Sequence, residues 1–143
     1  MHPYTYFQSC FFFIKMLLYH LTKNVPISLN QCWVNYQQKA EFNPPHSHSG
    51  YLSFVIWMKV PYDSDKEINA GPGTESNIKL NGQFTFYYVN SLGQMSTEYI
   101  PIDKTMENQF ILFPSCIYHS VHPFYSSDDY RISVAGNFYL NVG

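Results

Sequence analysis

The chain is poor in charged residues, and arginine is the scarcest of them. Charged residues make up 13% of its 143 residues, about half the share that is usual in soluble domains. Eight basic and ten acidic residues give a formal net charge of −2, without a basic block. Proteins dedicated to nucleic-acid binding carry a basic patch or stripe, so this class is disfavoured.

Cysteine is also scarce: Cys10, Cys32 and Cys116 are an odd number, without a C-x-x-C pair. Such spacing favours neither a disulfide framework nor a zinc finger, and it favours a reducing compartment. The apolar run 9–21 is too short to span a bilayer, and Lys15 interrupts it. The sequence therefore predicts a cytoplasmic protein that does not span a membrane.

Aromatic residues, in contrast, are abundant: 13 Tyr and 12 Phe bring their share to 19%. So much apolar surface predicts a packed core, and the length suits a single domain over residues 1–143. Apolar residues in 9–21 recur at helical spacing. We therefore expect residues 1–30 to hold a short helix that docks on the main sheet.

After residue 30 the pattern changes to short aromatic and β-branched runs separated by turn residues. Many short strands without helices between them predict an antiparallel sandwich or barrel over residues 31–143. The polar stretch 63–81 is expected to be a long loop, of a length that is often used for lids. The expected strands are 31–38, 51–60, 83–90, 95–101, 109–113, 118–123 and 130–140.

Two histidines stand immediately before the strand expected at 51–60, in the sequence NPPHSHSG. His46 and His48 are two residues apart, so in an extended chain they project to the same face. Pro44 and Pro45 favour that extended conformation. Two imidazoles on one face can share a metal ion. Two polar residues in an exposed loop would show the same spacing, and this alternative stays open.

Two further histidines, His119 and His122, lie in the segment 113–123. In a strand, residues three apart face opposite sides, so only one of them can point into a shared site. Cys116 has the same opposed relation to His119, and thiolate ligation lacks a second cysteine. A position at the rim, before a Pro-Phe turn, accounts for His122 without a ligand role.

Arg131 is the only arginine of the chain, and it begins an apolar strand. Arg131 and Ser133 share a strand face, and a guanidinium beside a hydroxyl is a natural receptor for a carboxylate. Arg131 follows His119 by twelve residues, which allows the two to lie on the strands of one hairpin. An ion pair with Asp128 or Asp129 is the structural alternative for Arg131.

Taken in order, these residues resemble the Fe(II)/2-oxoglutarate-dependent dioxygenases. The shared pattern is a His-x-acid pair before a strand, a distal His and then R-x-S, and it covers about residues 31–140. More closely, the chain is similar to the small oxygenases of this type that are frequent in marine bacteriophage genomes. The matching stretches are WVNY at 33–36, FNPPHSHSG at 42–50, LSFVI at 52–56, FPS at 113–115, HSVHPF at 119–124 and RISVAGN at 131–137.

The resemblance implies a double-stranded β-helix, which is a cupin-like jelly-roll of antiparallel strands. It implies an oxidoreductase with Fe(II) as its metal and with 2-oxoglutarate and dioxygen as cosubstrates, hydroxylating a primary substrate that the sequence does not reveal. Iron would bind His46 and His119, and the distal carboxylate of 2-oxoglutarate would bind Arg131 and Ser133. A phage protein of this type would act in the host cytoplasm.

One position departs from the family pattern, because His48 stands where the family has Asp or Glu. The usual triad is two His and one carboxylate, and three neutral imidazoles leave the iron centre one unit more positive. We expect His46, His48 and His119 to be the metal ligands, as in three-His cupin-type oxygenases. Three carboxylates are alternatives for completing the site: Glu41, Asp63 and Asp65.

Other functions are open because of this departure. One is a non-enzymatic jelly-roll that serves as a binding or virion-associated module, since the fold by itself does not fix a function. Another is a three-His metal protein of the cupin type. An aromatic-rich sheet can also bury a face in a partner, so a homo-oligomer is a further possibility.

Overall fold

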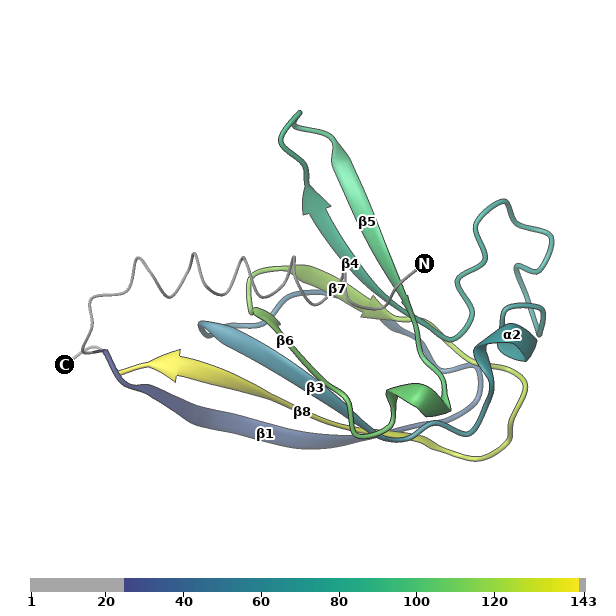
Figure 1. The fold of residues 1–143 in the computed structure, drawn as a ribbon, viewed down its shortest axis with the longest axis horizontal. Helices are drawn as coiled ribbons and strands as arrows, with labels where there is room; N and C mark the ends of the chain where they lie inside the picture. The colour runs from purple at the N-terminus through teal and green to yellow at the C-terminus, as the bar shows by residue number, and fades with distance from the viewer. Residues whose placement is uncertain (1–24, 142–143) are drawn as a thin grey trace.

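The computed structural model describes residues 25–141. Within them the chain forms eight strands and two short helices, which Figure 1 labels in chain order. The helices are α2 (Ser64–Glu67) and the 3-10 helix η1 (Lys104–Met106). The strands are β1 (Ile27–Gln37), β2 (Asn43–His46), β3 (Leu52–Lys59), β4 (Gln83–Val89), β5 (Met95–Pro101), β6 (Phe110–Pro114), β7 (Tyr118–Val121) and β8 (Arg131–Leu140).

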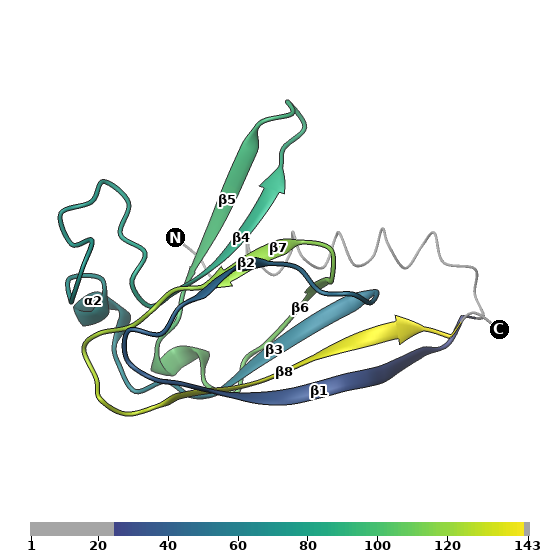
Figure 2. The same cartoon turned by 180° about the vertical axis from the view of Figure 1, so that it is seen from behind.

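The strands form two four-stranded antiparallel sheets that face each other. One sheet has the order β1-β8-β3-β6, and the other has the order β2-β7-β4-β5. Sequential strands alternate between the sheets at several points, as the view from behind in Figure 2 shows. This arrangement confirms the predicted jelly-roll, or double-stranded β-helix.

Most expected strands are found within one or two residues of their predicted ends. β1 is longer than expected, since it begins at Ile27. β2 was expected only as an extended approach to the next strand, but Asn43 and His46 pair with β7. The polar stretch 63–81 contains the short helix α2. The helix expected within 1–30 lies outside the described residues.

The aromatic residues form the core between the sheets. Trp57, Phe84 and Phe113 are almost fully buried, and the rings of Trp57 and Phe84 meet edge to face at 5.6 Å. Burying side chains of this size supplies roughly 1.5–3 kcal/mol each and is the main force that holds two sheets together. Within the described part of the chain, no helix has the length and apolar character needed to cross a membrane.

The prediction that His119 and Arg131 lie on one hairpin is wrong. β7, which carries His119, belongs to one sheet, and β8, which begins at Arg131, belongs to the other. The segment between them crosses the layers because Phe124 is fully buried and stacks on Tyr62 at 5.0 Å. The two residues therefore face each other across the interior instead of lying side by side.

Candidate active site

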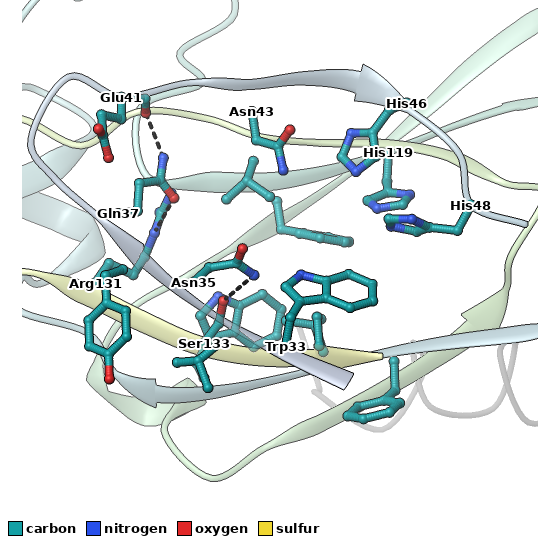
Figure 3. A pocket seen from close by; sticks show the side chains of 18 of the residues that line it. Trp33, Asn35, Gln37, Glu41, Asn43, His46, His48, His119, Arg131 and Ser133 are labelled. Atoms are coloured by element: carbon teal, nitrogen blue, oxygen red, sulfur yellow. Dashed lines mark hydrogen bonds between the residues drawn. The ribbon is translucent and has the colours of Figure 1, made fainter. Parts of the chain in front are cut away.

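A cavity of about 520 Å³ lies between the two sheets. β1 and β8 line it from one side, and β2 and β7 line it from the other. Figure 3 shows histidines at one end of this cavity and Arg131 at the other, with Trp33, Asn35 and Ser133 between them. The sheets thus bring residues from both halves of the sequence to one hollow.

Three histidines meet at one end of the cavity. His46 on β2 is the cross-strand partner of His119 on β7, and their ring centroids are 4.4 Å apart. His48 follows just beyond β2, and its ring lies 4.9 Å from His46 and 5.0 Å from His119. One nitrogen from each ring lies within 4.8 Å of the others, which is a group that could hold a metal ion. Metal–imidazole bonds are about 2 Å long, so the three nitrogens would draw closer together around a shared ion.

Backbone carbonyls fix the orientation of two of these rings. His46 Nδ1 lies 2.7 Å from the carbonyl oxygen of Pro44, and His119 Nδ1 lies 3.1 Å from that of Ile117. A carbonyl oxygen only accepts, so each Nδ1 carries the proton and donates. The Nε2 atom of each ring keeps a free lone pair, which is the usual arrangement in histidines that bind a metal.

The surroundings lower the pKa of two of these rings. Burial and, to a smaller extent, the nearby His46 and His48 lower the pKa of His119 from 6.5 to about 4, and only the hydrogen bond to Ile117 opposes the shift. Burial, followed by the proximity of His46, also lowers the pKa of His48. Neutral imidazole is the form that binds metal ions, so these shifts favour the metal-binding form of His48 and His119.

The remaining metal-ligating candidates lie elsewhere. His122 lies outside the cluster, stacks near Phe42 at 5.4 Å and faces Ser120 Oγ at 3.2 Å. Cys116 is also outside the cluster and exposed. Among the three alternative carboxylates, only Glu41 lines the cavity. Its side chain accepts a hydrogen bond from the backbone N–H of Gln38. Within residues 25–141 the cluster is therefore made of histidines alone.

Arg131 lies at the other end of the cavity and is almost fully buried. Its Nε and Nη2 atoms donate to Gln37 Oε1 at 3.2 and 2.6 Å, and Nη2 also donates to the His122 carbonyl at 2.7 Å. Nη1 donates to the hydroxyl of Tyr62. These acceptors are all neutral, whereas a buried charge is ordinarily balanced by an opposite one.

The alternative of an ion pair between Arg131 and an aspartate is excluded. Asp128 pairs with Lys39 and Asp129 pairs with Lys59, both at the surface. Within the described residues, the ion pairs are all formed by lysines, and none of them includes Arg131. A buried guanidinium that faces a cavity and has only neutral partners is suited to bind an anionic ligand.

Ser133 lies beside Arg131 on the cavity side of β8, as the spacing predicted. Its hydroxyl accepts a hydrogen bond of 3.4 Å from Asn35 Nδ2 on the neighbouring strand. Such a long bond leaves the hydroxyl free to turn toward a ligand. Ser133 therefore adds a polar group to the wall between Arg131 and the histidines.

Sequence reasoning missed Gln37 and Tyr62, the two side chains that hold Arg131 in place. Trp33, Asn35 and Gln37 alternate along β1 and all line the cavity, so the period-two spacing was a usable signal. Tyr62 follows β3 in a connecting segment and carries no such signal. Burial raises its pKa against the effect of the Arg131 charge, so its hydroxyl stays protonated.

The polar stretch 63–81 does not line the cavity, so the structure does not support a lid there. Its Glu67 is fully buried and anchors the segment to the crossing between β7 and β8. Glu67 Oε1 accepts from the Tyr125 amide at 2.6 Å, and Oε2 accepts from the Ser126 amide at 2.9 Å and from the Ser126 hydroxyl. This stretch therefore supports the segment that leads into Arg131.

Fold and site together define a jelly-roll with a histidine cluster and a buried arginine in one cavity. The family model described as "Putative 2OG-Fe(II) oxygenase" matches residues 31–137, so the chain belongs to this family. The family implies Fe(II) as metal and 2-oxoglutarate and dioxygen as cosubstrates. A comparison with curated protein sequences finds no match.

Among solved structures, the fold is similar to that of an oxidoreductase of the 2OG-Fe(II) oxygenase family from Burkholderia pseudomallei. The TM-score is 0.58 at 15% sequence identity, and the match covers 91% of this chain. The chain spans about half the length of that protein, since the match covers 51% of it. At this identity the similarity supports the fold alone.

The residues of the cavity fit both groups that the family implies. Three imidazoles form a donor set that suits ferrous ion as well as other divalent transition metals. A buried guanidinium without an anion suits a dicarboxylate such as 2-oxoglutarate. The absence of a carboxylate among the three clustered side chains distinguishes this site from the usual triad.

Proposed function

We propose that this protein is an Fe(II)- and 2-oxoglutarate-dependent oxygenase that hydroxylates a substrate still to be identified. The observation that carries the proposal is one cavity with a cluster of three histidines at one end and a buried Arg131 with only neutral partners at the other. 2-Oxoglutarate has a keto acid that chelates a metal and a distal carboxylate that needs a cation. Its two ends match the two ends of the cavity.

In this proposal His46, His48 and His119 hold the metal. The hydrogen bonds from Nδ1 of His46 and His119 to backbone carbonyls fix both rings before the ion arrives. Preorganised rings lose little entropy on binding, and outer partners of this type strengthen metal affinity by 10- to 100-fold. The low pKa of His119, about 4, means that metal binding releases no proton from this ring at neutral pH.

Arg131 and Ser133 hold the distal carboxylate of 2-oxoglutarate. The guanidinium is positioned from behind by the Tyr62 hydroxyl and the His122 carbonyl, so its plane does not need to be ordered by the ligand. A carboxylate reaching Arg131 replaces the neutral oxygen of Gln37 with a charged one. Charge-assisted hydrogen bonds are roughly twice as strong as neutral ones, which favours this exchange.

When bound, Fe(II) and 2-oxoglutarate supply the activation of dioxygen, with conversion of 2-oxoglutarate to succinate and carbon dioxide and transfer of oxygen to the substrate. The chain provides the surroundings for that chemistry. Trp33 packs 5.5 Å from the His48 ring, and Phe84 stacks on His119 at 5.5 Å. These rings shield the faces of His48 and His119 that they cover from water.

The proposal is tested by oxygen-dependent formation of succinate from 2-oxoglutarate, measured without a primary substrate. We expect a rate above that of free iron in the same buffer. Arg131→Ala should abolish 2-oxoglutarate binding and leave the iron content near that of the wild type. Arg131→Lys keeps the charge but loses the planar fork, so it should bind weakly. Succinate formation no faster than with free iron would show that the jelly-roll is not this enzyme.

A three-His metal protein with other chemistry is the second candidate, and the all-histidine cluster favours it. It predicts iron binding without any effect of 2-oxoglutarate on the metal. A non-enzymatic binding or virion module predicts that the cluster holds a metal only as a structural staple. Metal content and 2-oxoglutarate binding, measured together, separate these cases.

The same proposal includes the subtype of oxygenase and the compartment in which the protein acts. The stretches FNPPHSHSG and RISVAGN support the small type found in marine bacteriophage genomes, and a phage protein would act in the host cytoplasm. The aromatic-rich composition leaves a homo-oligomer open, and sedimentation of the purified chain would detect it.

A further inference from the structure

β1 is an edge strand that borders the cavity. It pairs with β8 on one side, and among the described residues no hydrogen bond reaches the other side of the stretch 32–37. Five consecutive residues, Trp33 to Gln37, line the cavity. In a strand only alternate side chains share a face, so the cavity also reaches β1 beyond its inward-facing side chains, which fits a position beside the edge of this strand.

The four edge strands of the two sheets differ in how they are protected. Natural proteins guard an edge with proline, with charged residues or by keeping the strand very short. β2 has four residues and two prolines, β5 contains Glu98 and Pro101, and β6 ends with Pro114. β1 has 11 residues and contains neither proline nor charge. Its one irregularity falls between Leu29 and Gln31, away from the cavity.

An unguarded edge is a template for another strand. A chain added beside β1 would run about 4.7–4.9 Å from it, and its N–H and C=O groups would pair with those groups of β1 that have no partner among the described residues. Its side chains would alternate between the cavity and the outer face. On the outer face Val34 and Tyr36 are 49% and 64% exposed and offer apolar contacts.

We propose that the primary substrate is an extended polypeptide that pairs with the edge of β1 and directs one side chain into the cavity toward the histidine cluster. This inference rests on the proposed function, since it names the substrate class of the same site. The absence of charged residues from β1 agrees with recognition through the main chain and apolar side chains. Main-chain pairing gives affinity without requiring a particular sequence.

A capped peptide that alternates Thr and Val between terminal lysines tests the proposal. It is labelled with a fluorophore and titrated with the full chain, loaded with Fe(II) and 2-oxoglutarate under nitrogen. Two further peptides carry N-methyl groups on alternate residues, one on the even positions and one on the odd. Because only one edge of the peptide pairs with β1, one N-methylated peptide should bind at least tenfold more weakly and the other should bind as before.

Two variants locate the binding edge. Val34→Lys places a charge on the exposed face of β1 and should weaken peptide binding at least tenfold. Met95→Lys makes the same change on β5, the edge strand of the other sheet, at a residue that is 72% exposed and does not line the cavity. This matched control should bind the peptide like the wild type.

Three outcomes would overturn the proposal. One is absence of peptide binding, and another is an equal effect of both N-methylated peptides. The third is a concentration-dependent dimer that Val34→Lys dissociates, which would mean that a second copy occupies β1. Each is independent of the proposed function, because 2-oxoglutarate binding to the iron-loaded chain is measured separately.

Discussion

Gln37 Oε1 accepts hydrogen bonds from both Nε and Nη2 of Arg131 and thus occupies the side of the guanidinium that a carboxylate would take. Gln37 and Arg131 are also cross-strand partners in the pairing of β1 with β8. Gln37 Nε2 in turn donates to the Glu41 carbonyl at 2.6 Å, which holds the amide in place. In this structure the neutral amide oxygen of Gln37 therefore occupies the position that the proposed ligand carboxylate would take.

This relationship predicts opposite effects for two substitutions of Gln37. Gln37→Glu places a permanent carboxylate on Arg131, so binding of 2-oxoglutarate should weaken at least tenfold, or about 1.4 kcal/mol. Gln37→Ala removes the competing oxygen, so binding should tighten a few-fold. Calorimetric titration of the iron-loaded protein under nitrogen measures both. Equal affinities in Gln37→Glu and the wild type would place the carboxylate elsewhere.

Restoring the usual triad is a second prediction. His48→Asp adds one negative charge at the cluster and should tighten Fe(II) binding at least about tenfold, because carboxylate–cation attraction is several kcal/mol even at an effective dielectric constant near 20. Competition with a coloured chelator under nitrogen measures the affinity.

The control for this variant is His122→Gln, which changes a histidine outside the cluster and should keep the metal stoichiometry. Loss of metal in His48→Asp, or an equal loss in His122→Gln, would contradict the assignment of the three histidines.

Glu67 gives a prediction about stability. Its carboxylate is fully buried and accepts three hydrogen bonds from Tyr125 and Ser126. Glu67→Ala leaves these donors without a partner and should lower the free energy of unfolding by about 3 kcal/mol. Glu75→Ala, at an exposed position of the same stretch, should change it by less than about 0.5 kcal/mol. Urea denaturation measures both, and equal effects would refute the anchoring role.

Asp103 gives a prediction about pH. Burial raises the pKa of this carboxyl, but hydrogen bonds from Thr105 and Ser64 outweigh burial and lower the pKa overall. A lowered pKa in the folded state stabilises the fold above the unfolded value, near 3.9, and the contribution is lost as pH falls through the folded pKa. Asp103 also caps η1 through the Thr105 amide.

Asp103→Ala should therefore lower the free energy of unfolding by about 1 kcal/mol at pH 7. The difference from the wild type should shrink below pH 4, where the carboxyl takes up a proton. Urea denaturation at pH 7 and pH 3 provides the comparison. A difference that is constant between these two values would contradict an effect of the ionised carboxylate.

The sequence was sufficient to predict most of the strands and five of the residues that line the cavity: His46, His48, His119, Arg131 and Ser133. Aromatic and β-branched runs mark strands, and the spacing of His46 and His48 puts both on one side of an extended chain. Arg131 and Ser133 share a face for the same reason. These relationships are local, so they depend only on the period of the strand.

The contacts that hold the Arg131 side chain and the segment leading to it are not local in the sequence. Gln37 meets Arg131 only through the register of two strands that are 94 residues apart in the chain. Tyr62 and Glu67 reach their partners from connecting segments, where no periodicity indicates direction. The turn signals at 126–129 suggested a hairpin, but the buried ring of Phe124 carries the chain to the opposite sheet.

The most direct test of the central claim is an anaerobic titration of the iron-loaded protein with 2-oxoglutarate, followed by its visible metal-to-ligand charge-transfer band. We expect a saturable band in the wild type and none in His119→Ala, because His119 is the most buried of the three clustered histidines. Iron binding without any band in the wild type would contradict the claim that this cavity binds 2-oxoglutarate at its metal.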